Sequence, residues 1–111
     1  MEIRGNNIGK GLYATKKYLK NEIIHNLSGK MYDNPTRETI HIGNNKHIYD
    51  NYGIFINHSF TPTVYIRNTN VIALVDINEN DEITFNYNDN EINMACPFTI
   101  NGIAVCGKYY H

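Results

Sequence analysis

The sequence of 111 residues contains no tryptophan, three prolines and two cysteines. Cys96 and Cys106 have neither Cys-x-x-Cys nor Cys-x-Cys spacing, which excludes a tetrahedral zinc site made of cysteines alone. Their spacing is compatible with a disulfide, but no apolar secretion signal follows Met1, so we expect reduced cysteines and an intracellular protein. The longest apolar run, Val71 to Val75, is far too short to span a bilayer, and we expect no membrane partner.

Good helix formers are also scarce. Alanine and leucine are rare, whereas asparagine and isoleucine are frequent. This composition disfavours long helices and favours strands joined by turns. An apolar content of 41%, with nine tyrosines and four phenylalanines, is ordinary for a globular chain and argues against disorder. We therefore expect one mostly β domain, which no repeat or linker divides.

Strong net charge is absent as well. The value of −1 produces no strong electrostatic field and predicts no direct binding to nucleic acid. Residues 1–50 hold eight Lys or Arg against five Asp or Glu, whereas residues 51–111 hold two against six. The six acidic residues are Asp76, Glu79, Asp81, Glu82, Asp89 and Glu91. They form either a solvated surface or an acidic rim that attracts a basic substrate.

Periodicity and turn residues predict a series of short strands. These are expected at Leu12–Thr15, Glu22–Leu27, Lys30–Tyr32, Thr63–Arg67, Val71–Asp76 and Glu82–Tyr87. The segment 68–70 should form the turn of a hairpin, and the alternation in the last strand is that of a half-buried strand. His47–Asp50 and Ile54–Asn57 are consistent with short strands or one helical turn, and no element is assigned after Asn93.

Three motifs could carry chemistry, although each has an ordinary structural explanation by itself. The glycines of Gly9–Leu12 let backbone amides approach a ligand, or form a turn into a strand. Asn57-His58-Ser59 ends an apolar strand as an Asx or Ser turn would. The five histidines lack the spacing of metal ligands, and we expect no metal. Tyr87 ends the last predicted strand, where a hydroxyl often finds a partner as the chain leaves the core.

The order of these motifs is more specific than any one of them. Gly-Lys-Gly-Leu-Tyr-Ala begins at Gly9, Phe-Ile-Asn-His-Ser-Phe-Thr-Pro at Phe55, and Asp-Ile-Asn-Glu-Asn-Asp-Glu-Ile-Thr-Phe-Asn-Tyr at Asp76. Together they resemble the SET-domain protein-lysine methyltransferases over Ile8 to Tyr87, and the length is similar to the minimal stand-alone SET proteins of viruses and bacteria. The resemblance implies an irregular fold of several small sheets with a C-terminal pseudoknot, as a single domain over residues 1–111.

The resemblance also implies a site for S-adenosylmethionine and a protein substrate that contains lysine. The implied cofactor-binding residues are Gly9, Lys10, Gly11, Leu12, Asn57 and His58. Tyr87 matches the catalytic tyrosine, and the implied lysine channel contains Phe85, Tyr65 and Leu27. Residues 93–111 would form a lid without zinc, whose candidate aromatic residues are Phe98, Tyr109 and Tyr110. An acidic rim would favour a lysine in a basic context.

Three positions depart from the family pattern. Leu27 stands where many relatives have a tyrosine, so one hydroxyl that directs the amine is missing and the degree of methylation is open. Phe60 replaces the usual cysteine after Asn-His-Ser, and no zinc-binding cysteine cluster follows. Thr63 replaces an asparagine, a change that we expect to be tolerated.

Two other classes of function stay open. Leu27 and the very short insert between Met31 and Asp50 favour a SET-fold module that binds a peptide or a cofactor without catalysis. The insert usually helps to form the substrate groove, and a homodimer could restore that wall. Composition alone also allows a β-rich structural protein, which leaves the ordered motifs unexplained.

Overall fold

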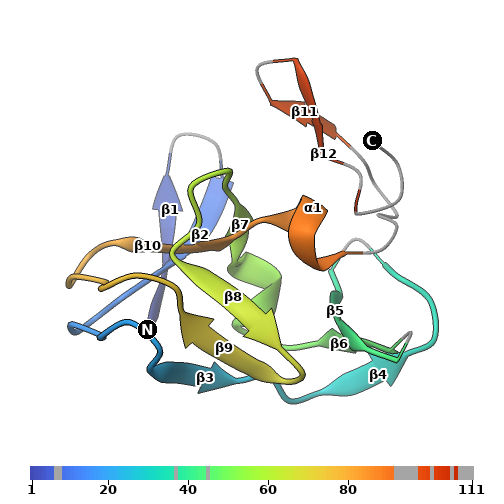
Figure 1. Cartoon of the computed structure of the whole chain (residues 1–111), viewed down its shortest axis with the longest axis horizontal. Helices are drawn as coiled ribbons and strands as arrows, with labels where there is room; N and C mark the ends of the chain where they lie inside the picture. Colours follow the sequence, from blue (N-terminus) through green and yellow to red (C-terminus); the bar gives the residue numbers. More distant parts are fainter. Residues whose placement is uncertain are drawn as a thin grey trace.

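The computed structural model describes residues 1–6, 9–36, 38–44, 46–91, 98–100, 102–105 and 107. Strands predominate in these ranges and form several small sheets, which confirms the predicted fold class (Figure 1). The elements are β1 (Glu2–Asn6), β2 (Gly9–Tyr13), β3 (Ile23–Asn26), β4 (Lys30–Tyr32), β5 (Ile40–Gly43), β6 (Lys46–Tyr49), η1 (Gly53–Phe55), β7 (Asn57–His58), β8 (Val64–Arg67), β9 (Asn70–Ala73), β10 (Glu82–Phe85), α1 (Tyr87–Asn90), β11 (Phe98–Ile100) and β12 (Ile103–Val105). No helix in the described ranges is long and apolar enough to cross a membrane.

The first sheet brings the three sequence motifs together. Its strand order is β1-β2-β10-β7. β1 and β2 form an antiparallel hairpin, and β2 also pairs with β10, with Leu12 opposite Ile83. β10 then pairs in parallel with β7, so that Phe85 lies opposite His58. This parallel contact between the second motif and the strand of the third agrees with the threading expected of the C-terminal pseudoknot.

β10 lies in the interior of the protein. Ile83, Thr84 and Phe85 are all buried, because β2 and β7 flank the strand and β8 packs beside it. The prediction of a half-buried strand was therefore wrong. The Thr63 hydroxyl satisfies the buried backbone: it accepts a hydrogen bond from the Thr84 amide at 3.0 Å and donates one to the Glu82 carbonyl at 3.1 Å. Thr63, which departs from the family pattern, thus helps to hold β10 in place.

Two further sheets flank the first. β3, β9 and β8 form one of them, and its β8–β9 hairpin confirms the turn predicted after Arg67. Asn68 in this turn has a φ of 54°, a left-handed conformation that asparagine tolerates better than most residues. β4, β6 and β5 form the other sheet, and the sequence did not predict β5. Gly53–Phe55 is a 3₁₀ turn, which was one of the two alternatives for that stretch.

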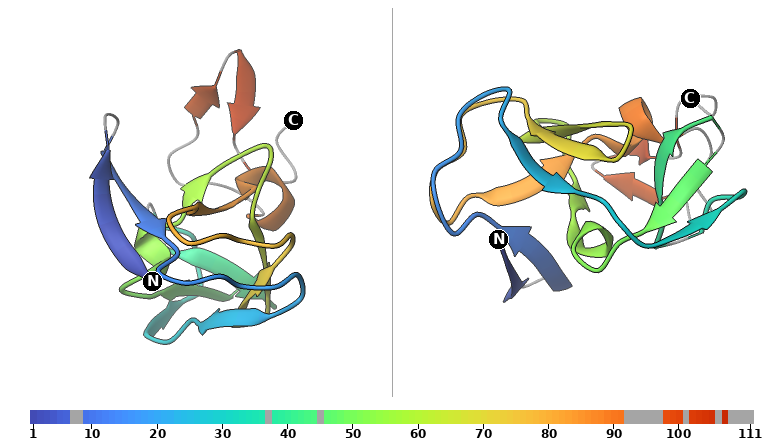
Figure 2. Two further views of the ribbon diagram at one scale, coloured as in Figure 1. Left: turned by 90° about the vertical axis from the view of Figure 1, so that its left-hand side faces the viewer. Right: turned by 90° about the horizontal axis from the view of Figure 1, so that it is seen from below.

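A small hairpin made of β11 and β12 follows the main body of the chain, with Ile100 opposite Ile103. Figure 1 shows it above α1, and both views of Figure 2 keep it next to that helix. One apolar cluster joins the three larger sheets beneath it. The largest fully buried side chains of this cluster are Leu12, Leu27, Ile48, Ile56, Ile77, Ile83, Val64 and Val71.

Asp50 connects the core to the segment that precedes β7. Its buried carboxylate accepts hydrogen bonds from the amides of Ser28, Tyr52 and Gly53 and from Nε2 of His25, at 2.7–3.0 Å. Burial by itself raises the pKa of Asp50, but these hydrogen bonds outweigh it, and the pKa is lowered. The ionised carboxylate therefore fixes the start of the 3₁₀ turn that leads into β7.

Candidate active site

Tyr87 is the first residue of α1, where the chain turns away from β10. The strand was predicted to extend to Tyr87, but it ends at Phe85. The reason is the N-cap: the side chain of Asn86 accepts a hydrogen bond from the Asn88 amide at 2.9 Å and starts the helix. The Tyr87 amide then donates to Nδ1 of His58 at 3.0 Å, which ties the helix to the second motif.

The hydroxyl of Tyr87 is held in one orientation. It donates a hydrogen bond to the carbonyl of Ile56 at 2.8 Å. Burial raises the pKa of Tyr87, and the nearby carboxylates of Glu91 and Glu82 raise it further. The hydroxyl therefore keeps its proton at physiological pH and acts as a hydrogen-bonding group, not as a base. The sequence could not indicate Ile56, because the interacting group belongs to the backbone.

Asn57 on β7 is held by two acceptors. Its Nδ2 donates to the carbonyl of Lys10 at 3.0 Å and to Oε2 of Glu82 at 2.8 Å. These partners require the nitrogen of the amide on their side, so Oδ1 is left as the acceptor of the group. A Cβ atom at Gly11 would lie 2.7 Å from Oε2 of Glu82 and 3.2 Å from Nδ2 of Asn57. Glycine at this position therefore leaves room for the Asn57–Glu82 pair.

His58 is a neutral imidazole with a defined tautomer. Because Nδ1 accepts the hydrogen bond from the Tyr87 amide, the ring proton is on Nε2. Within the described part of the chain, Nε2 is buried and has no hydrogen-bond partner. Burial lowers the pKa of His58, against an opposing effect of Asp89. The ring thus serves as an acceptor for the helix and as a packing surface.

Aromatic rings surround His58. Its ring centroid lies 4.4 Å from that of Phe60, 5.1 Å from that of Tyr87 and 6.1 Å from that of Phe98, all edge to face. Tyr87 also lies 4.7 Å from Phe85 and 6.1 Å from Phe98. The structure therefore brings one predicted channel residue and one predicted lid residue to the predicted catalytic tyrosine. The other two predicted lid residues, which fall outside the described ranges, are Tyr109 and Tyr110.

One side chain attaches the C-terminal hairpin to α1. Nδ2 of Asn88 donates to the Ala104 carbonyl at 2.8 Å, and Oδ1 accepts from the Gly107 amide at 3.1 Å. Together with Phe98, this amide holds the hairpin beside Tyr87. Asn88 was not predicted as a site residue, because nothing in the sequence distinguishes it from its neighbours in an asparagine-rich chain.

The glycine motif lies at the β1–β2 hairpin. Gly9 has a φ of 138°, which favours glycine, and the next carbonyl, that of Lys10, accepts the hydrogen bond from Asn57. The Lys10 ammonium lies 6.0 Å from the centre of the Phe55 ring. Leu12 is fully buried in the core, so only its backbone could face a ligand.

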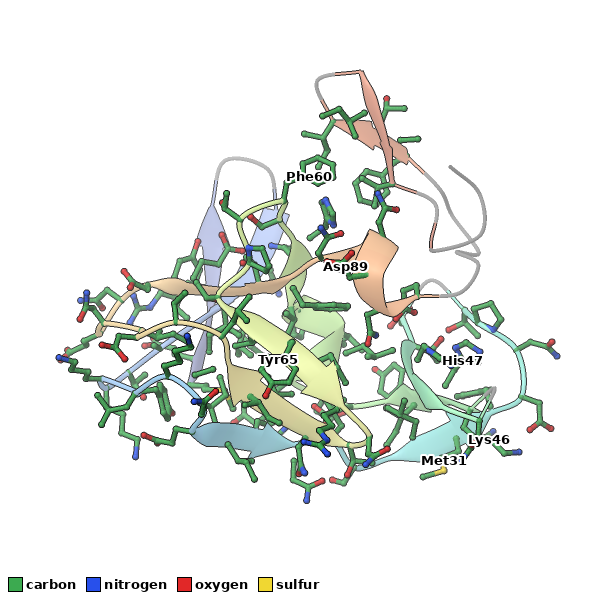
Figure 3. All side chains as sticks on the ribbon, in the orientation of Figure 1. Met31, Lys46, His47, Phe60, Tyr65 and Asp89 are labelled. Carbon is green, nitrogen blue, oxygen red and sulfur yellow. The ribbon has the colours of Figure 1, made fainter. Side chains whose placement is uncertain are left out.

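Two of the predicted channel residues lie elsewhere. Leu27 is 2% exposed and packs in the core against Gly53, where a Cβ atom would lie 3.0 Å from Cδ2 of Leu27. Tyr65 lies exposed on β8, and Figure 3 shows it well away from α1. Among the described residues, no hydrogen bond or ring contact links either side chain to Tyr87. Their place in a lysine channel stays a prediction.

The acidic residues of the second half do not form one group. Asp76 and Asp81 each accept a hydrogen bond from a backbone amide at 2.9 Å, in the β9–β10 connection. Figure 1 shows this connection on the opposite side of the molecule from α1. Glu91 and Glu82, by contrast, lie close enough to Tyr87 to raise the pKa of its hydroxyl. Both were predicted only as acidic surface or rim residues, although the spacing of four residues between Tyr87 and Glu91 was an available signal.

The arrangement of these residues defines a SET-type protein: the strand that carries Asn57-His58 pairs in parallel with the strand that precedes Tyr87, next to a glycine hairpin. Residues 9–88, most of the chain, match the SET domain family, and the chain belongs to that family. Among the described residues, no group of three or more His, Cys, Asp or Glu could hold a metal ion.

Two solved structures are among those similar to this chain. One is a Plasmodium falciparum protein provisionally assigned as a histone methyltransferase, with a TM-score of 0.63 and 27% identity over 78% of this chain and 94% of that chain. Another is a humanized mutant of the Chaetomium thermophilum Polycomb Repressive Complex 2 bound to an inhibitor, with a TM-score of 0.62 and 16% identity. That match covers 95% of this chain but 18% of the longer one, and it supports the fold alone. No curated protein sequence matches the chain significantly.

Proposed function

We propose that the protein is a protein-lysine N-methyltransferase that uses S-adenosylmethionine. The observation that carries this proposal is the position of the Tyr87 hydroxyl, which is fixed by the Ile56 carbonyl immediately before the Asn57-His58 step. A phenol that keeps its proton at neutral pH and lies near the carboxylates of Glu91 and Glu82 suits a reaction of positively charged and amine groups. Membership of the SET domain family supports the same reaction class.

The groups around Asn57 fit the methionine end of S-adenosylmethionine. Oδ1 of Asn57 is an acceptor, and the carboxylate of Glu82 places a negative charge beside it, so this side of the site favours the α-ammonium group over the α-carboxylate. The backbone of Gly9–Leu12 would hold the remainder of the methionine end, and the main chain of His58 would contact the adenine. When bound, S-adenosylmethionine supplies the activated methyl group.

The protein itself must bring a neutral lysine amine to the site. The pKa of free lysine is about 10.4, so most of the amine is protonated in water. Removal of water beside Phe85 and Tyr87 disfavours the ammonium form, and no strong base is then required. Because the Tyr87 hydroxyl donates its hydrogen bond to the Ile56 carbonyl, its oxygen is available to accept a hydrogen bond from the amine. Orientation of the amine would then supply most of the acceleration.

The proposal is tested by transfer of a labelled methyl group from S-adenosylmethionine to proteins that contain lysine, histones among them. We expect transfer by the wild type and a fall of about 100-fold in Tyr87→Phe, because the amine loses its acceptor. Cofactor affinity, measured by calorimetry, should be retained in that variant. Tyr32→Phe on β4 is the matched control and should transfer normally. We also expect Asn57→Ala to weaken cofactor binding, and unchanged affinity would contradict the role assigned to Asn57.

A binding module without catalysis is the second candidate. The buried, aliphatic side chain of Leu27 favours it, because this residue supplies no hydroxyl to the site. This function predicts saturable binding of S-adenosylmethionine or a lysine peptide with no methyl transfer by the wild type to any candidate protein. Absence of both binding and transfer would contradict both proposals and favour a structural protein.

The proposed partner is a protein substrate that contains lysine. Glu82 accepts a hydrogen bond from Asn57 and Asp89 acts electrostatically on His58, so these acidic side chains near the site would favour basic residues around the target lysine. We propose no membrane or nucleic-acid partner, and the homodimer stays a prediction that sedimentation analysis would test. Mass spectrometry of proteins methylated in the native lysate would identify the substrate.

A further inference from the structure

The end of α1 is bound to β5 by reciprocal hydrogen bonds. The His41 amide donates to Oε2 of Glu91 at 2.9 Å, and Nδ1 of His41 donates to the Asn90 carbonyl at 3.0 Å. Nδ2 of Asn90 donates in turn to the His41 carbonyl at 3.0 Å and to Oε2 of Glu91 at 2.6 Å. We call this set of three residues the Glu91 clamp. It joins segments 49 and 50 residues apart in the chain.

The clamp continues directly to Tyr87. The amide of Glu91 donates to the Tyr87 carbonyl at 2.8 Å, which closes the single turn of α1. Tyr87 is thus held by its amide to His58, by its hydroxyl to Ile56 and by its carbonyl to the clamp. The first two hydrogen bonds come from β7 and the residue before it. Of these three hydrogen bonds, the third leads to the sheet of β4, β6 and β5 through the clamp, and Figure 1 shows β5 beside the end of α1.

The carboxyl group of Glu91 is buried, and burial disfavours its ionised form. Glu91 is 6% exposed, and burial raises its pKa to about 7, although the hydrogen bonds from His41 and Asn90 act in the opposite direction. An apolar side chain would avoid this cost. The carboxylate nevertheless accepts hydrogen bonds from two donors, the His41 amide and Nδ2 of Asn90. The buried carboxyl group of Glu91 is best explained by the fixed arrangement of β5 and α1 that its hydrogen bonds impose.

Two histidines complete the surroundings of the clamp. The ring of His47 lies 5.2 Å from that of His41, and burial, with the proximity of His41, lowers the pKa of His47. In the described part of the chain, Nε2 of His41 and Nδ1 of His47 are buried without partners. Tyr87 and Asp89 are the other titratable groups of α1, and burial raises the pKa of Tyr87.

We propose that Glu91 and His41 are positioning residues that align Tyr87 with the β4–β6–β5 sheet. This inference rests on the proposed methyltransferase function. Neither residue need touch the cofactor or the substrate. Their effect is to fix the C-terminal end of α1, and through it the tyrosine, relative to the segment between Met31 and Asp50. The ionised form of Glu91 accepts the two hydrogen bonds more strongly than the neutral form, so the alignment is best above the pKa of this group.

The test compares Glu91→Gln with Glu38→Gln, the same chemical change at an exposed site two residues before β5. Glutamine resembles the neutral form of Glu91. The ratio of wild-type to Glu91→Gln kcat should therefore be close to one at about pH 6 and rise to about tenfold at about pH 8. The ionisation of the substrate lysine cancels in this ratio. Cofactor affinity should be unchanged, and Glu38→Gln should give a ratio of one throughout.

His41 gives a second test through a conservative variant. His41→Asn retains a donor for the Asn90 carbonyl near the position of Nδ1, whereas His41→Ala removes it. We expect His41→Asn to keep a higher kcat than His41→Ala. A ratio for Glu91→Gln that does not vary with pH, or equal losses of kcat and cofactor affinity, would overturn the proposal.

Hydrogen exchange separates this inference from the proposed function. The His41 amide should exchange faster in Glu91→Gln than in the wild type above about pH 7, and at the wild-type rate in Glu38→Gln. If the wild type transfers no methyl group, the proposed function fails. The exchange measurement then tests only whether Glu91 holds β5 to α1. An unchanged exchange rate of the His41 amide in Glu91→Gln would overturn that role.

Discussion

The amide of Tyr87 donates a hydrogen bond to Nδ1 of His58 at 3.0 Å, across 29 residues of sequence. This bond fixes the tautomer of the imidazole and the start of α1 at the same time. It also places the ring of His58 5.1 Å from that of Tyr87. The side chain of the second motif thus positions the backbone of the third, in addition to any role of its main chain toward a ligand.

The first prediction concerns this bond. His58→Ala leaves the Tyr87 amide without its acceptor and removes a ring from the aromatic cluster, so we expect a loss of about 3 kcal/mol in the free energy of unfolding. His58→Asn can supply an oxygen close to the position of Nδ1 and should lose less. Urea unfolding of the two variants measures the difference. Equal losses in both would mean that packing, and not the hydrogen bond, is what His58 contributes.

The second prediction concerns the pH dependence of stability at Asp50. Its pKa is lowered from 3.8 in the folded protein, so its contribution to stability is complete above about pH 4 and is lost as the pH falls through the lower folded value. Asp50→Asn should cost roughly 2–3 kcal/mol at neutral pH, because the amides of Ser28 and Gly53 lose a charged acceptor. The difference between the wild type and Asp50→Asn should be constant from about pH 5 to 8 and decrease at lower pH. A difference that persists undiminished in acid would contradict the assigned cause.

The third prediction contrasts two glycines. A Cβ atom at Gly29 would lie 1.8 Å from the backbone oxygen of Tyr49, and φ there is 156°, so Gly29→Ala should cost roughly 4 kcal/mol or more. At Gly11 the nearest atom is the movable end of Glu82, so Gly11→Ala should cost less than about 1 kcal/mol. Gly11→Ala should instead weaken S-adenosylmethionine binding, because Glu82 moves away from Asn57. Thermal unfolding and calorimetry on both variants provide the comparison.

The fourth prediction concerns the C-terminal hairpin as a lid. Asn88→Ala removes both hydrogen bonds to the hairpin, so we expect faster proteolysis after residue 91 and cofactor affinity about tenfold weaker. Asn88→Asp keeps an acceptor for the Gly107 amide but loses the donor to Ala104, and should be intermediate. Wild-type affinity in Asn88→Ala, together with faster proteolysis, would show that the hairpin does not close the cofactor site.

Local patterns in the sequence predicted local structure well. The β8–β9 hairpin follows from its asparagine turn, and the 3₁₀ turn at Gly53–Phe55 was one of two alternatives for its stretch. The end of β10 was misplaced, because a helix N-cap at Asn86 competed with the alternation that extended the strand to Tyr87. The burial of Thr84 was missed for a different reason: the strands that cover it come from distant parts of the chain.

The sequence by itself determined the class of fold and identified Asn57, His58 and Tyr87 as site candidates. The order of the short motifs can be read along the chain without knowing which residues are in contact. Only the tertiary structure decided how these residues are held. The acceptors of Asn57, the tautomer of His58 and the Glu91 clamp depend on contacts between segments 25 to 50 residues apart. Such contacts form when distant strands pair around a common core, and no local pattern of residues encodes them.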